Sequence, residues 1–304
     1  METRVLTADV EIPYLGFGTY LIADNQVAAA VREAIRAGYR HIDTAESYQN
    51  ESGVGAGIKQ ALESEGLARS DIFVTTKLWP GNPAWGQPAK TTDSTITSLD
   101  NSLERLGLDY VDLYLIHAPF DRNQRLAQWR GLLELKRQGK ARAIGVSNFS
   151  IQHLQELKDA GLPMPAANQL ELQPWSQKPE LVRYLNDNAI TPIAYSSLVP
   201  LSSWRTSNGQ QSAKTHQMKA DGERPDSPFR LMAEKYGVTE AQVLLRWAIQ
   251  KRYPVVPKST NPERIRSNAE IFGFDLDDQD MAAIEKMDRG EGVAWAMGDP
   301  TKAR

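Results

Sequence analysis

Hydrophobic residues along this chain recur in two alternating patterns. Short, continuous apolar runs predict buried strands, and the stretches between them, in which apolar positions return every three or four residues, predict amphipathic helices. A small hairpin would come first, from Val5–Leu6 and Val10–Ile12. We then expect eight core strands, at residues 13–20, 40–43, 72–77, 111–117, 141–146, 167–170, 192–195 and 254–257.

A helix is expected to follow each strand. In the first of these helices, Val27, Val31, Ala34 and Ile35 share one face, and Gly38 would end the helix. Further helices are predicted at 52–63, 92–106, 125–137, 150–159, 179–188, 239–250 and 261–269. Alternating strand and helix units predict an α/β fold, a (β/α)8 TIM barrel that forms one domain over residues 1–304, rather than an open doubly wound sheet. The glycine-rich fingerprint of a Rossmann dinucleotide site does not follow the first strand.

Two segments depart from the short connections of a compact barrel. Residues 199–227, after the seventh strand, are polar and rich in proline and glycine, which is typical of a functional lid or a disordered segment. The tail at 290–304 carries Trp295 and Met297 between glycines and prolines, and we expect it to be irregular.

Composition narrows the function mainly by exclusion. A net charge of −3 over 304 residues argues against nucleic acid or an anionic membrane as the main partner. The chain has no cysteine, which excludes disulfides and thiolate chemistry. We find neither a signal segment nor an apolar run long enough to span a bilayer, so a cytoplasmic protein is expected.

Three polar side chains stand where buried apolar runs give way to loops: Asp43, Lys77 and His117. Such strand ends meet at one face of a barrel. Tyr48 follows Asp43 by five positions. A phenol with a pKa of about 10 needs help to act as an acid at neutral pH, so Lys77 would lower that pKa and Asp43 would hold Lys77. Taken singly, an ion pair, a core histidine and a loop aromatic explain these residues equally well.

Five motifs, taken together and in this order, resemble the aldo-keto reductase family. They are His41–Ala45 with Tyr48, Thr76–Trp79, Leu113–His117, Gly145–Phe149 and Val256–Ser259, and the resemblance runs from about Pro13 to Phe274. It implies NADPH-dependent reduction of an aldehyde or ketone to an alcohol by direct hydride transfer. It also implies that Asp43, Tyr48, Lys77 and His117 are catalytic, that Nε2 of the histidine faces the carbonyl oxygen, and that no metal is used.

The resemblance further implies an NADPH/NADP+ site. Nicotinamide contacts fall on Ser147, Asn148, Gln169 and Tyr195, ribose contacts on Gly18, Thr19 and Tyr20, and pyrophosphate contacts on Ser196 and Leu198. By the same resemblance, Lys258, Ser259 and Arg264 would contact the 2′-phosphate, and Asn268 would contact the adenine. The residues themselves also favour a phosphate here, because a helix that starts at Asn261 would present unpaired amides beside Lys258, Ser259, Thr260 and Arg264. The absence of an acid at the phosphate-contacting positions favours NADP over NAD.

Aromatic residues on the expected loops suggest an apolar substrate pocket: Tyr20, Trp79, Phe120 and Trp295. Relatives often carry His-Trp-Pro where this chain has His117-Ala118-Pro119, so we expect Ala118 to widen the pocket. The expected partner is a small aldehyde or ketone, bound by a monomer or weak dimer.

Two other functions stay open. Lys77 or Lys258 would be the nucleophile of an aldolase-type lyase that forms a Schiff base, although this leaves Tyr48 unexplained. Alternatively, the chain would be an NADP-binding regulatory subunit without turnover. The complete set of four candidate catalytic residues counts against that reading.

Overall fold

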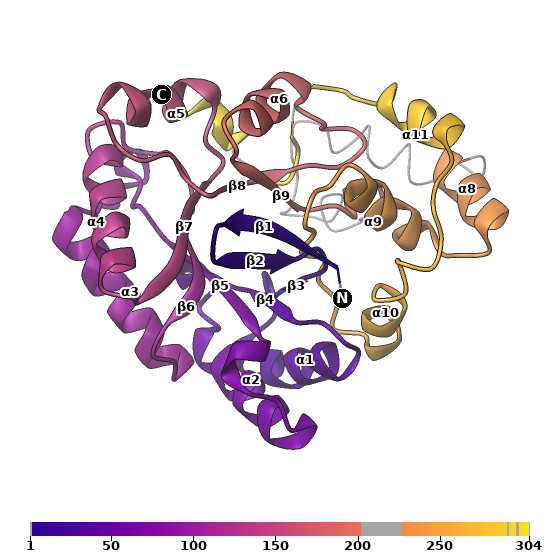
Figure 1. Ribbon diagram of the computed structural model, residues 1–304, viewed down its shortest axis with the longest axis horizontal. Coiled ribbons are helices and arrows are strands. Elements are labelled where there is room, and N and C mark those ends of the chain that lie inside the picture. Colours follow the sequence, from indigo (N-terminus) through magenta and orange to yellow (C-terminus); the bar gives the residue numbers. More distant parts are fainter. Residues whose placement is uncertain (1, 202–226, 291, 296–297, 304) are drawn as a thin grey trace.

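The computed structural model describes residues 2–201, 227–290, 292–295 and 298–303. Seven parallel strands pair in chain order and curl into a barrel that helices surround (Figure 1). The strands are β3 (Phe17–Gly18), β4 (His41–Asp43), β5 (Phe73–Leu78), β6 (Val111–Ile116), β7 (Ala141–Ser147), β8 (Ala167–Glu171) and β9 (Thr191–Tyr195). Parallel pairing in sequential order with helical crossovers is the arrangement of a (β/α)8 barrel.

The predicted eighth strand is a closing segment rather than a regular strand. Within it, Val255 forms isolated parallel bridges to Leu15 on one side and to Ala194 on the other. A Cβ on Gly18 would lie 2.6 Å from the carbonyl oxygen of Val256, so glycine is what lets the first strand approach this segment. The barrel therefore closes, and the predicted fold is confirmed.

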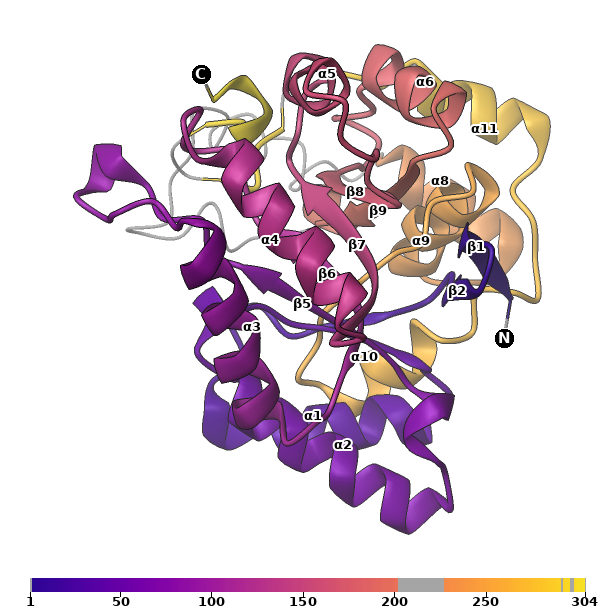
Figure 2. The same ribbon diagram turned by 60° about the vertical axis from the view of Figure 1, so that its left-hand side comes forward.

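An antiparallel hairpin covers the end of the barrel at which the strands begin. It consists of β1 (Thr3–Thr7) and β2 (Val10–Pro13), as predicted. Leu6, Val10 and Ile12 are buried in one cluster with interior side chains such as Phe73 and Leu113. Figures 1 and 2 show the hairpin lying across this end. The predicted first core strand is shorter than expected, because its first residue belongs to the hairpin and only Phe17–Gly18 pairs with β4.

The helices bury the apolar faces that their spacing predicted. In α1 these are Val27, Val31, Ala34 and Ile35, and the chain leaves the helix through Gly38 at a φ of 96°. The helices are α1 (Asp24–Arg36), α2 (Glu51–Glu65), α3 (Thr92–Leu106), α4 (Arg125–Arg137), α5 (Ile151–Asp159), α6 (Pro179–Asp187), α8 (Pro228–Tyr236), α9 (Glu240–Gln250), α10 (Pro262–Ser267) and α11 (Asp278–Glu285).

Two of these helices were not predicted. α8 has only nine residues, so its apolar face of Phe229, Met232 and Ala233 is short. In α11 only Ile284 is buried, which leaves almost no amphipathic pattern to detect. No helix in the described part of the chain is both long and apolar enough to cross a membrane.

The predicted lid is described only at its two ends. Val199–Leu201 forms a 3₁₀ turn and Ser227 precedes α8, whereas residues 202–226 lie outside the described residues. The described part of the tail contains one 3₁₀ turn, Pro300–Lys302, and is otherwise irregular, as expected.

Candidate active site

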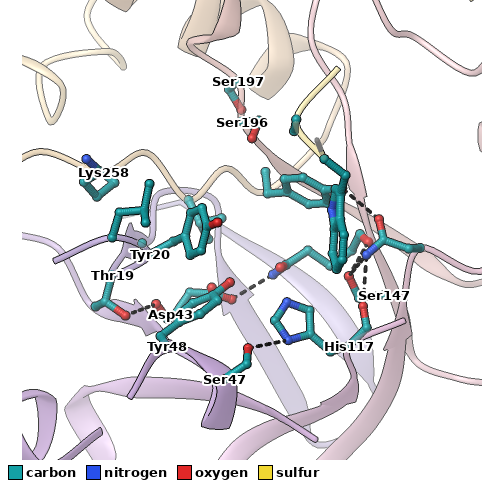
Figure 3. A pocket seen from close by; sticks show the side chains of 18 of the residues that line it. Thr19, Tyr20, Asp43, Ser47, Tyr48, His117, Ser147, Ser196, Ser197 and Lys258 are labelled. Atoms are coloured by element: carbon teal, nitrogen blue, oxygen red, sulfur yellow. Dashed lines mark hydrogen bonds between the residues drawn. The ribbon is translucent and has the colours of Figure 1, made fainter. Parts of the chain in front are cut away.

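A cavity of about 670 Å³ opens where the carboxyl ends of the strands meet (Figure 3). Most of the predicted site residues line it, although they come from segments far apart in the sequence. They are Gly18, Thr19, Tyr20, Asp43, Tyr48, Trp79, His117, Ser147, Asn148, Gln169, Tyr195, Ser196, Leu198, Lys258 and Trp295.

A buried ion pair joins Asp43, which lines this cavity, to Lys77, which does not. Side chains alternate along a strand, so Lys77 points inward while Thr76 points outward and donates to Glu51 of α2. The Lys77 Nζ donates to Oδ1 of Asp43 at 2.6 Å and to the carbonyl oxygen of Thr44 at 2.8 Å. Both charged side chains are almost completely buried. Each charge therefore depends on the other, since an unpaired ion at this depth would be strongly unfavourable.

Tyr48 lies on a 3₁₀ turn, Glu46–Tyr48, that follows β4. Its hydroxyl oxygen is 3.4 Å from the Lys77 Nζ. Burial, and then the Asp43 carboxylate, raise the pKa of Tyr48 well above its ordinary value. The pKa of Tyr48 therefore moves in the direction opposite to the one expected, and burial is the largest cause. The phenol keeps its proton at neutral pH.

His117 follows β6 and is held from several sides. The Ser47 Oγ lies 3.2 Å from its Nδ1, and the rings of Tyr48 and Trp79 pack edge-on against the imidazole. Burial, and then the charge of Lys77, lower the pKa of His117 well below its ordinary value, so the ring is neutral. Its Nε2 has no hydrogen-bond partner among the described residues, and in Figure 3 this side of the ring faces the cavity.

A hydrogen-bonded network connects β7, β8 and β9 at one side of the cavity. Gln169 Nε2 donates to Oδ2 of Asp43 at 2.7 Å, and the Ser147 hydroxyl donates to the carbonyl oxygen of Gln169 at 2.8 Å. Asn148, at a φ of 63°, donates from Nδ2 to the carbonyl oxygen of His117 and accepts at Oδ1 from the Tyr195 hydroxyl. These side chains therefore have defined positions before any ligand binds.

Ser147 and Asn148 lie shortly before α5, a place from which a side chain could also cap the helix. The structure assigns that task to Ser150, whose hydroxyl accepts from the backbone N–H of His153 and begins α5. The two residues are thus free of a capping role, and the cavity is where their side chains lie.

The end of the cavity beside the closing segment is cationic and rich in hydroxyl groups. Burial lowers the pKa of Lys258, and no acidic side chain in the described part of the chain pairs with it. Ser197, which also lines the cavity, is buried, and its Oγ has no hydrogen-bond partner within the described residues. A cation and a hydroxyl donor without protein partners suit a phosphate group.

The expected unpaired amides at the start of α10 are not there. Asn261 Oδ1 accepts hydrogen bonds from the backbone N–H groups of Glu263 and Arg264, so the chain caps its own helix. The expectation of a site built on free amides is therefore wrong. The cavity lining does not include four residues expected to contact the cofactor: Ser259, Thr260, Arg264 and Asn268.

Four aromatic side chains form a wall beside His117: Trp79, Trp85, Phe120 and Trp295. Trp79 and Trp85 are stacked at 6.0 Å between ring centroids, and Phe120 meets Trp85 at 5.4 Å and Trp295 at 5.7 Å. Phe120, which was expected in the substrate pocket, contacts these rings but is not among the residues that line the cavity. Ala118 is fully buried and also lies outside the lining. That the small side chain widens the pocket stays a prediction, which Ala118→Trp would test.

The C-terminal tail is fastened to the barrel by buried carboxylates. Glu171, at the end of β8, accepts hydrogen bonds from the backbone N–H groups of Val293 at 2.9 Å and Ala294 at 2.8 Å. Asp299 forms an ion pair with Lys178. Trp295 is thereby placed over His117, with 6.0 Å between the ring centroids.

Sequence reasoning missed several lining residues: Leu21, Ser47, Trp85, Ser197, Val199, Val256, Pro257 and Ala294. Most are direct neighbours of predicted residues, so the signal lay within the same motifs. Trp85 had its own signal, an aromatic residue at a proline turn that Asn82 caps. The described residues contain no group of three or more His, Asp or Glu side chains arranged to hold a metal ion.

Comparison with known proteins gives a consistent result. Residues 14–289 match the model of the family described as "Aldo/keto reductase family". The chain is 38% identical to glyoxal reductase of Bacillus subtilis, over 96% of this chain and 95% of that protein. It is 39% identical to methylglyoxal reductase DkgA of Yersinia pestis, over 92% and 90%. A Bombyx mori aldo-keto reductase solved in complex with NADP superposes with a TM-score of 0.83 at 34% identity, over 95% of this chain and 93% of that one.

Proposed function

Since the chain belongs to the aldo/keto reductase family, we propose that it reduces aldehydes or ketones to alcohols with NADPH, and that Tyr48 donates the proton. The chain is an NADP-dependent oxidoreductase. The observation that carries the proposed residue roles is that Asp43, Tyr48 and His117 line one cavity, while Lys77 contacts Asp43 and Tyr48 beside it.

The cavity fits an NADP cofactor at both of its ends. Lys258 and Ser197 supply a cation and a buried hydroxyl that have no partners among the described residues, which suits a phosphate. At the other end, Ser147, Asn148 and Gln169 present amide and hydroxyl groups that suit a carboxamide. We therefore assign Lys258 and Ser197 to the phosphate groups of the cofactor, with Lys258 at the 2′-phosphate. Ser147, Asn148 and Gln169 are assigned to the nicotinamide. The bound cofactor supplies the hydride that reduces the carbonyl carbon.

Tyr48 is the proton donor in this proposal. Because its pKa is raised by burial, the phenol is protonated at neutral pH and can give its proton to an oxygen that gains negative charge. The resulting phenolate would lie beside the Lys77 ammonium, 3.4 Å from it in the resting arrangement. Asp43 holds that ammonium in place from the opposite side.

His117 stabilises the same oxygen. Its ring is neutral, and Nε2 faces the cavity without a partner in the described structure. A donor fixed in advance at the place where charge develops is the arrangement that lowers a barrier most effectively. The aromatic wall beside the ring excludes water and would receive the apolar part of the substrate.

The test is the loss of NADPH absorbance with a panel of aromatic aldehydes, sugars and α-keto esters, together with NADPH binding by fluorescence titration. We expect turnover with several carbonyl compounds. NADPH binding without turnover of any carbonyl would instead support the regulatory subunit. Borohydride trapping of a covalent adduct on Lys77 or Lys258 would instead support the aldolase-type lyase.

A further inference from the structure

Ser47 provides the one hydrogen bond to the His117 ring within the described structure. We propose that Ser47 is a positioning residue: its hydroxyl donates to Nδ1 of His117 and thereby keeps the ring proton on Nε2, where it faces the cavity. This inference rests on the proposed function, in which Nε2 donates to the substrate oxygen. It assigns to Ser47 a task that neither the sequence motifs nor the comparisons suggest.

Both partners sit on anchored backbone. Ser47 lies in the 3₁₀ turn Glu46–Tyr48, where the N–H of Tyr48 donates to the carbonyl oxygen of Ala45 at 3.0 Å. The backbone N–H of His117 donates to the carbonyl oxygen of Leu78 at 3.0 Å. The carbonyl oxygen of His117 accepts from Nδ2 of Asn148 at 2.9 Å. The separation of 3.2 Å between Oγ and Nδ1 thus joins two fixed segments. Figure 3 shows this contact below the His117 ring.

The direction of this hydrogen bond decides whether Nε2 presents a donor or an acceptor to the cavity. A neutral imidazole carries one N–H donor and one acceptor nitrogen. If Ser47 donates to Nδ1, then Nε2 carries the proton and can donate to a carbonyl oxygen. In the opposite arrangement, Nε2 would direct its lone pair at an oxygen that becomes negative, and the two would repel each other. The Ser47 hydroxyl also has no other acceptor among the described residues, so donation to Nδ1 gives its proton a partner.

Another histidine in the same protein shows the same device and supplies an internal reference. The Nδ1 of His153 accepts from the backbone N–H of Ser150 at 3.1 Å, and its Nε2 lies 2.9 Å from the carbonyl oxygen of Ala303. A carbonyl can only accept, so His153 carries its proton on Nε2. Its ring makes no contact with Ser47, and its tautomer should not respond to substitution there.

The expected size of the effect is that of a single hydrogen bond. Ser47 is exposed at the rim of the cavity, so water competes for its hydroxyl. A net contribution of this kind corresponds to a change of roughly threefold to tenfold in the ratio of the two tautomers. The Ser47→Ala substitution at an exposed position should leave folding unchanged.

The experiment is long-range ¹H–¹⁵N NMR of the histidine rings in the full chain at pH 7.5, which distinguishes the tautomers by their nitrogen shifts. In the parent protein we expect His117 to carry its proton on Nε2. In Ser47→Ala we expect its two nitrogen shifts to move toward each other as the tautomers mix, whereas Ser47→Thr, which keeps the hydroxyl, should resemble the parent. An Nδ1–H tautomer in the parent, or identical His117 shifts in parent and Ser47→Ala, would overturn the proposal.

Kinetics provide the second readout. With NADPH and a carbonyl substrate, Ser47→Ala should lower kcat by about threefold to tenfold, because the loss concerns the developing charge. The dissociation constant of NADPH should stay unchanged, and Ser47→Thr should restore kcat. An unchanged kcat in Ser47→Ala would count against the proposal. The NMR result needs no turnover, so a failure of the proposed function would be recognised separately.

Discussion

Removal of the Lys77 charge should destabilise the protein through the partner that it leaves behind. In Lys77→Met, the carboxylate of Asp43 stays buried but loses an ammonium at 2.6 Å. Thr44 and Tyr48 also lose a hydrogen bond each. Breaking a buried ion pair in this way typically costs about 3–5 kcal/mol. Gln169 still donates to the other carboxylate oxygen, so we expect about 3 kcal/mol, at the lower end of that range.

A double-mutant cycle separates the charge from the packing. Asp43→Asn in the Lys77→Met background removes the carboxylate that was left unpaired, so we expect it to restore about 1–2 kcal/mol. Lys59→Met is a matched control, because Lys59 is an exposed lysine on α2. We expect that substitution to stay within about 0.5 kcal/mol of the parent.

The assay is urea unfolding at pH 7, followed by circular dichroism and by tryptophan fluorescence. Lys77→Met should lower the midpoint without changing the dependence on urea. A cost below about 1 kcal/mol for Lys77→Met would refute the reasoning. The reasoning would also be refuted if Asp43→Asn cost as much free energy of unfolding in the Lys77→Met background as it does in the parent, since the two charges would then act independently.

Three further predictions concern the cofactor, the tail and pH. Lys258→Met should weaken NADPH binding by about tenfold or more but NADH binding little, because a charge-assisted phosphate contact is lost; equal losses in fluorescence titrations would contradict the assignment. Glu171→Gln should raise the KM for the carbonyl several-fold and leave NADPH affinity unchanged, because one of the two backbone N–H groups beside Trp295 would face an NH2 donor in place of its acceptor oxygen; an unchanged KM would exclude this role. Burial lowers the pKa of His41 to about 4, so the unfolded chain binds a proton below about pH 6.5 that the folded chain does not, and stability should fall from there to pH 4. His41 alone contributes about 3 kcal/mol to this fall, and His117 and His153, whose pKa values burial also lowers, add to it in the same direction. Urea midpoints that stay constant or rise over this range would contradict it.

The fold and the centre of the site could be predicted because they depend on local periodicity. Apolar runs followed by helical spacing place Asp43, Lys77 and His117 at strand ends, and closure of the barrel then brings those ends together. The side chain of Lys77 points inward for the same reason, since it follows Phe73 and Thr75 at alternate positions of β5.

Other features could not be predicted because they arise from tertiary structure. The direction in which the pKa of Tyr48 shifts depends on its burial and on the nearby Asp43 carboxylate, and the spacing of residues in the sequence shows neither. Glu171 meets backbone amides more than a hundred residues away, which leave no sequence signal. At α10 the error had another source: the helix start at Asn261 was predicted correctly, but the Asn261 side chain itself accepts from the amides that were expected to bind a phosphate.

The central claim is that Tyr48 donates the proton, and a single-turnover measurement tests it most directly. Protein loaded with NADPH is mixed with an aromatic aldehyde, and the decay of NADPH absorbance is followed for the parent and for Tyr48→Phe. We predict that the variant binds NADPH as the parent does but reacts about 10²- to 10⁴-fold more slowly, the range for loss of a general acid. Equal decay rates in the two proteins would contradict the claim.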